Sequence, residues 1–510
     1  MNSADNFPII IGVGQVVDHW SGNDTAAAPH PIGIVQKAIA RALEDASKTN
    51  LAQYVDCAAF VRTFPDSLIM PYNPFGKVKN FPRAVIARSE IDPQKVIYSS
   101  AGGEQPQALV SRLSEQLHAG DIGLAVIAGG EVTGALKLAL KKSLVLNWTD
   151  STDGDVNDDG PKTDFISGYE IRNGLGLPPK TYAAMDQSLR ARLGMTKAKY
   201  REYTGQILSN LSRTAENNPY AQFPQFQTPE YLATPSKDNH PIFEPYLKWH
   251  MAQDAVNQAA ALVLTTVGKA KELGIDESKW VYLHGYAQVE DALVSKRPDL
   301  SRSDAIESVI KRALKGAQLM AKDITYHDIY SCFPVVTYLG AECLGLDPLQ
   351  DQLTMTGGLP FFGGAGNNYS THAIASLVDA LRADPKTYGL VLANGGFMSK
   401  EAAGIYSTKA PKNWTPISSD DLQKAIDSRS DIKMLDENCT AVIEGYCVKH
   451  SREGLAGGYI IARNEKGRVI ANIKSEDIAT LQSFVDSDEV VGKVVTIIHR
   501  DGQNFLETPV

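Results

Sequence analysis

TYGLVLANGG, at residues 387–396, repeats the pattern of DIGLAVIAGG, at residues 121–130. Each stretch is an apolar run that ends in two glycines, and such a run indicates a strand buried on both faces. Each also completes the same series of elements, because a strand, a helix, a second strand and a second helix precede it. We infer an internal duplication of a βαβαβ unit, which predicts an α/β fold with mostly parallel sheets covered by helices.

Hydrophobic spacing and helix start and stop signals place the elements of both halves. In the first half they are a strand at residues 8–17, a helix at 31–46, a strand at 95–99 and a helix at 104–119. In the second half they are a strand at residues 280–289, a helix at 305–317, a strand at 324–332 and a helix that starts at Ser370 and stops at Asp384. Ligands bind beyond the carboxyl ends of parallel strands, so we expect the functional site where the two Gly-Gly ends lie.

Two segments lie outside the duplicated halves. Residues 135–246 are rich in Asp, Asn, Pro, Tyr and Lys and predict an inserted loop domain over the site, with helices at residues 182–193 and 198–218. The tail is strand-like, with hairpin turns at residues 465–467 and 500–503, and predicts a small antiparallel β-barrel. The predicted boundaries are residues 1–278 and 279–405 for the two halves, 406–432 for a linker with a short helix, and 433–510 for the barrel.

Composition excludes several classes of protein. Of 510 residues, 43% are hydrophobic and 21% are charged, as in ordinary globular proteins. The net charge of -9, without a basic stripe, argues against a nucleic-acid partner. No apolar run approaches the roughly 20 residues of a membrane helix, and the N-terminus does not resemble a secretion signal, so we expect a cytoplasmic protein.

The sequence indicates no metal site and no disulfide framework. Its five cysteines form no CxxC pair. Residues 155–160 fit the start of a calcium loop, but Ile166 stands where the bidentate acid is needed, so a solvated acidic loop is the better interpretation.

A glycine-rich stretch, TMTGGLPFFGGAGNNYSTH at residues 354–372, precedes the last predicted helix, and we call it the glycine loop. Gly363, Gly364 and Gly366 allow the backbone to approach a ligand closely. Asn367 and Asn368 supply amide groups at a helix start, where an anion or a polarised carbonyl can bind. The plain alternative is a polar loop that leads into a capped helix.

Several motifs carry a family resemblance. DAVNQAAALVL at residues 254–264 is similar to the DGAAALVL helix of thiolases, AGGE at residues 128–131 to their GGxE strand end, and IYSCF at residues 329–333 to the HDCF segment of sterol-carrier-type thiolases. Residues 1–405 therefore resemble the thiolase superfamily, and the tail resembles the extra barrel of thiolase-like proteins of type 1, often labelled acetyl-CoA acetyltransferases. The resemblance implies the thiolase fold, an acyl-CoA thioester as substrate or ligand in lipid metabolism, and no further cofactor.

The catalytic residues of thiolases are missing. The segment that should hold the nucleophilic cysteine, YSSAGGEQP at residues 98–106, contains none. The window for the family's GHP histidine, residues 363–366, holds only Gly and Ala, and the second cysteine is missing near Ala393. Covalent thiolase chemistry through these positions is therefore not expected, because the attacking thiolate has no counterpart.

Four side chains remain as catalytic candidates, each with a structural alternative. Glu104 stands at a helix start, where an acid also stabilises the helix dipole. Tyr330 occupies the place of the HDCF histidine and could polarise a carbonyl, or be a core tyrosine. His372 could act as acid or base, or serve a capping or surface role. Asn367 and the loop N–H groups could form an oxyanion hole. Cys332 matches the HDCF cysteine, and we interpret it as a buried inert thiol.

Two hypotheses of different classes follow. The first is an enzyme of the acyltransferase family that handles acyl-CoA by acid–base work, of which the thiolase-like aldolases that cleave β-hydroxyacyl thioesters are one case. Those aldolases use tyrosines, and Phe361 and Phe362 stand where a second one would be wanted. The second is a binding protein that keeps the thioester pocket without turnover. In either case the barrel offers a surface for a protein partner or for self-association.

Overall fold

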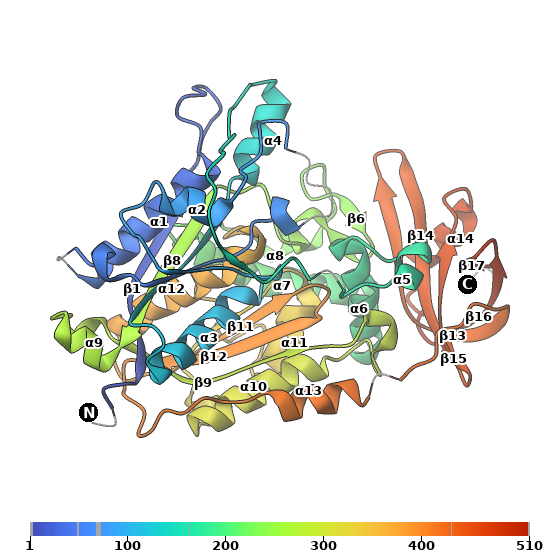
Figure 1. The fold of residues 1–510 in the computed structure, drawn as a ribbon. Coiled ribbons are helices and arrows are strands. Elements are labelled where there is room, and N and C mark those ends of the chain that lie inside the picture. Colours follow the sequence, from blue (N-terminus) through green and yellow to red (C-terminus); the bar gives the residue numbers. More distant parts are fainter. Residues whose placement is uncertain (1–3, 48–49, 68–72, 163, 430, 508–510) are drawn as a thin grey trace.

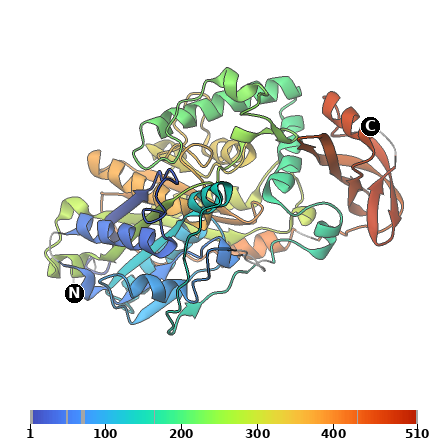
Figure 2. The same cartoon turned by 90° about the horizontal axis from the view of Figure 1, so that it is seen from above.

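The computed structural model describes residues 4–47, 50–67, 73–162, 164–429 and 431–507. The two halves form a layered α/β body, and the C-terminal barrel stands to one side of it (Figure 1, Figure 2). The predicted first strand and first helix are confirmed at both ends, as β1 (Pro8–Val17) and α1 (Pro31–Ala46).

The strands of the body join into one sheet of ten strands. Besides β1, they are β2 (Cys57–Phe60), β3 (Lys95–Tyr98), β4 (Leu124–Glu131), β5 (Asn157–Asp158), β8 (Gln258–Thr266), β9 (Val281–Glu290), β10 (Tyr326–Ile329), β11 (Gly389–Gly395) and β12 (Lys400–Ser407). Their order is β10-β11-β12-β9-β1-β8-β4-β2-β3-β5.

This order displays the duplication directly. Read outward from the central β9–β1 junction, β9-β12-β11-β10 mirrors β1-β8-β4-β2. In both halves the outer pair is parallel, β10 with β11 and β2 with β4, whereas the inner strands are antiparallel. The two-fold repeat is confirmed, but the prediction of mostly parallel sheets is wrong for the inner strands.

Strand β8 explains that error. The stretch QAAALVLTT, compared above with a helix, forms a strand paired on both edges, with β1 and with β4. Eight of its nine residues are buried, so the segment has no polar face, and periodicity cannot separate a buried strand from a buried helix. Strands β2 and β12 are likewise absent from the elements expected from the sequence.

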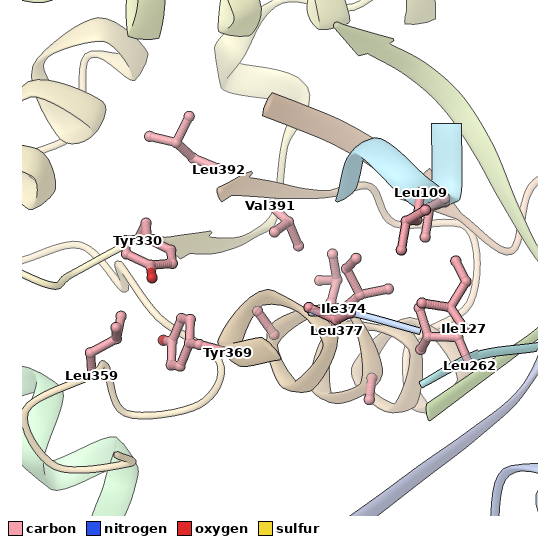
Figure 3. Packing of buried hydrophobic residues seen from close by; sticks show 14 of the residues in the cluster. Leu109, Ile127, Leu262, Tyr330, Leu359, Tyr369, Ile374, Leu377, Val391 and Leu392 are labelled. Atoms are coloured by element: carbon pink, nitrogen blue, oxygen red, sulfur yellow. The ribbon is translucent and has the colours of Figure 1, made fainter. Parts of the chain in front are cut away.

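Two central helices determine where the site lies. Helices α3 (Gln105–Ala119) and α12 (Tyr369–Ala383) pack against each other and contact strands of both halves. Figure 3 shows Ile374 and Leu377 of α12 in the core between Ile127 of β4 and Val391 of β11. Both helices start beside the strand ends, so the segment before α3 and the glycine loop meet there.

Matching glycines hold each first helix close to its strand. A Cβ atom on Gly12 of β1 would lie 2.1 Å from the carbonyl oxygen of Ala42 in α1, and a Cβ atom on Gly285 of β9 would lie 2.1 Å from that of Ala313 in α10 (Asp304–Ala317). The same close approach thus recurs at corresponding positions of the two halves. Only glycine fits there, because the neighbouring atom belongs to the backbone.

Replacing Gly285 with alanine is therefore expected to lower the free energy of unfolding by about 1–3 kcal/mol, as overpacking does in close-packed cores. Gly33 of α1 provides the control, because its added Cβ atom would meet nothing closer than 3.7 Å. Gly33→Ala should stabilise the helix by up to about 1 kcal/mol. Denaturant unfolding of both variants checks the result. Equal unfolding midpoints for the two variants would show that the close approach at Gly285 does not require glycine.

The insertion and the barrel pack against each other. The insertion contains α4 (Thr133–Lys142), α6 (Pro178–Arg192), α7 (Lys197–Glu216), α8 (Pro229–Ala233) and β6 (Pro241–Phe243). The barrel contains β13 (Cys439–Ser451), β14 (Gly454–Asn464), β15 (Gly467–Ile473), α14 (Ile478–Asp486), β16 (Val494–Arg500) and β17 (Gln503–Leu506). Pairing of β13 with both β14 and β16 closes the ring, and both predicted turns are confirmed. One pair, β15 with β17, is parallel.

The acidic loop at residues 155–160 contains β5, and Asp158 of that strand pairs with the buried Arg62. Within the described residues, no group of three or more His, Cys, Asp or Glu side chains could hold a metal ion. No helix in the same part of the chain is long and apolar enough to cross a membrane.

Candidate functional site

The segment before α3 and the glycine loop are tied together at the strand ends. The backbone N–H of Gly102 donates to Oδ1 of Asn367 (3.0 Å), and the Ser370 hydroxyl donates to the carbonyl of Gly103 (2.8 Å). Contacts between residues so far apart in the chain fix the start of α3 against the start of α12. The two segments therefore meet at the strand ends, where the sequence predicts the site.

Glu104 is a buried acid with an unsatisfied oxygen. Its side chain is 4% exposed, Oε1 accepts from Nε2 of Gln105 (2.7 Å), and Oε2 has no hydrogen-bond partner among the described residues. Oε2 fits over Gly395 only because that residue lacks a Cβ atom, which would lie 1.9 Å away. Burial raises the pKa of this carboxyl to about 7, although the positive charge of Lys400 opposes the shift. Glu104 can therefore both accept and donate a proton near neutral pH.

The Tyr330 hydroxyl lies beside the start of α3. A Cβ atom on Gly103 would be 2.3 Å from Oη of Tyr330 and 2.4 Å from the carbonyl oxygen of Asn394. The tyrosine is 6% exposed, and burial, together with the neighbouring Cys332 and Glu104, raises its pKa well above the usual value. It therefore keeps its proton at neutral pH and can act as a hydrogen-bond donor.

Two residues of the site were missed by sequence reasoning. Tyr182, from α6 of the insertion, accepts from the backbone N–H of Met398 (2.7 Å) and from Nδ2 of Asn394 (3.0 Å). Asn394, at the end of β11, also lies 3.4 Å from Sγ of Cys332. The only signal was the strand-end position of Asn394, because Tyr182 looked like any other residue of its helix. Burial raises the pKa of the Cys332 thiol, so this cysteine stays protonated.

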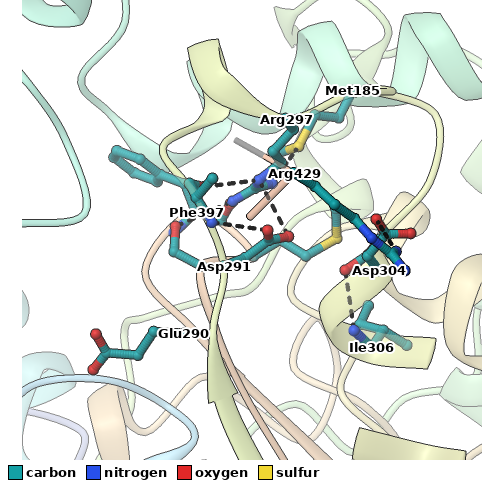
Figure 4. A network of polar contacts seen from close by, with 12 residues as sticks. Met185, Glu290, Asp291, Arg297, Asp304, Ile306, Phe397 and Arg429 are labelled. Atoms are coloured by element: carbon teal, nitrogen blue, oxygen red, sulfur yellow. Dashed lines mark hydrogen bonds and ion pairs between the residues drawn. The ribbon is translucent and has the colours of Figure 1, made fainter. Parts of the chain in front are cut away.

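A buried arginine braces this end of the sheet. Arg297 donates to the carbonyl of Phe397 (2.8 Å), contacts Sδ of Met185 (3.3 Å) and pairs with Asp291 (3.4 Å). Figure 4 shows these partners around its guanidinium. The turn after β11 is thereby fixed to α6, which carries Tyr182.

The two asparagines of the glycine loop are engaged by the protein itself. Asn367 Nδ2 donates to the carbonyl of Arg62 (2.8 Å), and Asn368 Nδ2 donates to the carbonyl of Gly129 (2.7 Å). Their oxygens accept from Gly102 and from Thr371. These amides therefore hold the loop in place, and in this conformation they leave little donor capacity for a thioester carbonyl.

The loop glycines serve close packing. Gly363 and Gly366 adopt positive φ values of 116° and 56°. An added Cβ atom would lie 2.7 Å from Oε1 of Gln258 at the first position and 2.6 Å from Oε1 of Glu131 at the second. Both are thus fitted against protein atoms, whereas an added Cβ atom on Gly364 would meet nothing closer than 3.4 Å.

His372 lies apart from Glu104 and Tyr330. Two residues after Ser370, it is turned by about 200° around α12 and so points away from Gly103. Its ring is fully buried, and Nδ1 lies 2.8 Å from Oε1 of Gln15 in β1. The surface role considered for this histidine is therefore wrong. Burial lowers its pKa to about 3, so the ring is neutral, and Nε2 has no partner within the described chain.

A cavity of about 700 Å³ lies next to the glycine loop, and we call it the aromatic hollow. The backbone beside it is bonded to both neighbouring segments, because Gly364 donates to the carbonyl of Gln253 (2.8 Å) and Ala252 donates to that of Cys332 (3.0 Å). The lining combines aromatic rings with amide side chains and consists of His19, Gln222, Phe223, Pro224, Gln225, Gln227, Lys248, Trp249, Gln253, Ala255 and Phe361.

A solved structure is similar to this chain over its full length. It is described as a monomeric SCP2-thiolase-like protein type 1 from Mycobacterium smegmatis and is 30% identical, with a TM-score of 0.83, and the match covers 99% of each chain. A family described as the thiolase-like protein type 1 additional C-terminal domain matches residues 421–503.

Curated relatives match over shorter stretches. Acetyl-CoA acetyltransferase 1 of Arabidopsis thaliana is 32% identical over 29% of this chain, and an acetyl-CoA acetyltransferase of Methanothermobacter thermautotrophicus is 28% identical over 35% of it. These stretches span only 35% and 43% of the two relatives. The dimeric peroxisomal thiolase of Saccharomyces cerevisiae, at 11% identity and a TM-score of 0.56 over 79% of this chain and 98% of its own, shares the fold.

Proposed function

This chain belongs to the thiolase-like proteins of type 1, and we propose that it binds an acyl-CoA thioester and moves a proton on the bound acyl group without forming an acyl-enzyme. The observation that carries this proposal is the buried pair of Glu104 and Tyr330 at the start of α3. One of these groups titrates near neutral pH and the other stays protonated. The curated relatives support acyl-CoA as the ligand.

The aromatic hollow suits the pantetheine arm of CoA. That arm is a flexible chain with amide groups and a branched apolar segment. Trp249 stacks on Phe361 at 5.9 Å and meets Phe223 edge-on, which gives one wall an apolar surface. Glutamine side chains provide amide donors and acceptors, and Lys248 places a cation 4.9 Å from the Trp249 ring, available to a phosphate.

Glu104 and Tyr330 have different roles in the proposed reaction. The Glu104 carboxylate takes a proton from the carbon next to the thioester carbonyl, and the Tyr330 hydroxyl donates a hydrogen bond to the carbonyl oxygen, where negative charge develops. Returning the proton from Glu104 restores the thioester. With a β-hydroxyacyl thioester, the same carboxylate takes the hydroxyl proton, the bond between the α and β carbons breaks, and an aldehyde or ketone and the enolate form.

A binding protein without turnover remains the second candidate. The engagement of both loop asparagines favours it, because an oxyanion hole needs donors that point at the carbonyl oxygen. The same protein would then hold the thioester in the aromatic hollow and leave it unchanged.

To test the proposal, the protein is incubated in deuterated solvent with acetyl-CoA or with a longer acyl-CoA. Mass spectrometry then measures how much deuterium has replaced the α-hydrogens of the thioester. Expected results are enzyme-dependent deuteration and an unchanged protein mass after incubation. Acylation of the protein would overturn the non-covalent mechanism, and binding without deuteration would leave the binding protein. Aldehyde release from a β-hydroxyacyl-CoA would identify the aldolase case.

Replacing Trp249 with leucine should raise the Kd for acyl-CoA about tenfold, because removing one stacked aromatic contact costs about 1–1.5 kcal/mol. Tyr54→Leu serves as the control, since Tyr54 is 43% exposed and lies outside the aromatic hollow. Calorimetric titration measures both variants. Equal affinities would show that the thioester binds elsewhere.

A further inference from the structure

A second cavity, of about 730 Å³, opens beside Glu104, and we call it the α3 groove. Glu104, Ala108, Arg112 and Glu115 line it along one face of α3, over about three helical turns or roughly 16 Å. The opposite wall is the linker at residues 416–420. Six acidic and three basic residues line the groove, so it is polar and carries excess negative charge, unlike the aromatic hollow.

Three neighbouring strands form the inner floor. Gly395 of β11 is paired with Lys400 of β12, and Lys400 is paired with Glu290 of β9. Paired residues lie on the same face of a sheet, and Oε2 of Glu104 lies over the first of them. Two strand spacings, about 10 Å, therefore separate the end of Glu104 from the position of Glu290.

Two of the three cations of the α3 groove, Lys400 and Arg112, are already engaged by the protein. Nζ of Lys400 donates to the carbonyls of Ala101 (3.1 Å) and Lys162 (2.9 Å). Arg112 forms an ion pair with Asp159 (2.9 Å). These charges are thus held in place, and neither needs an anionic ligand.

Glu104, Glu290 and Glu401 are among the acids of the groove with a carboxylate oxygen that lacks a partner in the described part of the chain. Successive residues of a strand point to opposite faces, so Glu401 is on the other face of the sheet from Lys400 and its partner Glu290. Oε2 of Glu104, on a side chain that is 4% exposed, has no partner within the described residues. The Glu290 carboxylate forms no hydrogen bond or ion pair with any residue that the structure describes, and Figure 4 shows it joined to none of the groups around Arg297. A cationic ligand would satisfy both the buried carboxyl of Glu104 and the free carboxylate of Glu290.

We propose that the α3 groove binds a linear aliphatic polyamine, with one ammonium group at Glu104 and another at Glu290. A metal ion is a poorer match, because no group of three acidic, histidine or cysteine ligands converges in the described part of the chain. An extended chain with ammonium groups about 10 Å apart fits the spacing of the two acids. Gln105, Gln288 and Gln423, which also line the groove, offer further hydrogen bonds to the ammonium groups.

Calorimetric titration with spermidine tests the site, with 1,8-octanediol as an uncharged chain of similar length. Spermidine should bind at micromolar concentration and the diol should not. Glu290→Gln should weaken spermidine binding at least tenfold, whereas Glu277→Gln, which removes the same charge outside the groove, should leave it unchanged. Because Glu290 is exposed, its replacement is not expected to disturb folding.

Absence of spermidine binding, equal binding of the diol, or equal losses in Glu290→Gln and Glu277→Gln would each overturn the polyamine site. None of these outcomes bears on the thioester, which is detected by α-hydrogen exchange and by the Trp249 variant. The two proposals can therefore fail independently.

Discussion

Replacing Glu104 with glutamine is expected to abolish exchange of the α-hydrogens and, at the same time, to stabilise the protein above pH 7. Glutamine has nearly the same shape but cannot take a proton, so the exchange rate should fall by about 10²–10⁴-fold, the usual contribution of a general acid–base group. If Glu104 only stabilised the dipole of α3, the Glu104→Gln protein would keep most of its exchange activity.

The gain in stability follows from the direction of the pKa shift. The carboxyl has a pKa of about 7 in the folded protein, against an ordinary value of 4.5. Between these values the folded state keeps a proton that the unfolded chain has released, so the free energy of unfolding falls as the pH rises from 4.5 to 7. The full penalty, about 3 kcal/mol, is present at pH 8. Glu104→Gln removes it there and has no such effect below pH 4.5.

Denaturant unfolding at pH 5 and pH 8 measures this difference, with Glu272→Gln as the exposed control. The control should unfold like the parent protein at both pH values. An active Glu104→Gln variant would remove Glu104 from the mechanism. If the stability of Glu104→Gln depends on pH in the same way as that of the parent protein, the pKa of Glu104 is not raised by folding.

The repeat of the two Gly-Gly strands was sufficient to predict the duplication, because buried strands that end at a site carry a strong local pattern. The inner strands could not be predicted in the same way. In β8 the run at residues 259–264 is entirely apolar, so the choice between helix and strand is made by pairing with β1 and β4, which are distant in the sequence. Tertiary pairing overrode the local signal.

The residues of the candidate site also fall into a predictable and an unpredictable group. Glu104 was identifiable because a helix start fixes its place, and Tyr330 because it occupies the histidine position of the HDCF resemblance. The surroundings of His372 were not predicted, because they include Gln15, which lies far away in the sequence. Tyr182 was not predicted as a site residue, because it reaches the site only when the insertion packs against the body. Residues fixed by local geometry are readable from one sequence, whereas those fixed by contacts between distant segments are not.

Placing a methyl group on Gly103 is expected to separate Tyr330 from the start of α3 and to reduce α-hydrogen exchange about 100-fold, because a shift near 1 Å has that effect in active sites. The added Cβ atom would lie 2.3 Å from the Tyr330 hydroxyl and 2.4 Å from the carbonyl of Asn394, so one of them must move. Stability should fall by about 1–3 kcal/mol, as in other overpacked cores. Gly168→Ala is the control, since no atom lies within 4 Å of its added Cβ.

A double-mutant cycle with Tyr330→Phe shows whether that hydroxyl is the atom displaced. In the Tyr330→Phe protein one of the two clashes is gone, so Gly103→Ala should cost less there, with a coupling energy of about 0.5–3 kcal/mol. Additive losses within about 0.5 kcal/mol would place the strain on the Asn394 carbonyl instead. In that case Gly103 would maintain the strand end, and the position of Tyr330 would depend on β10 alone.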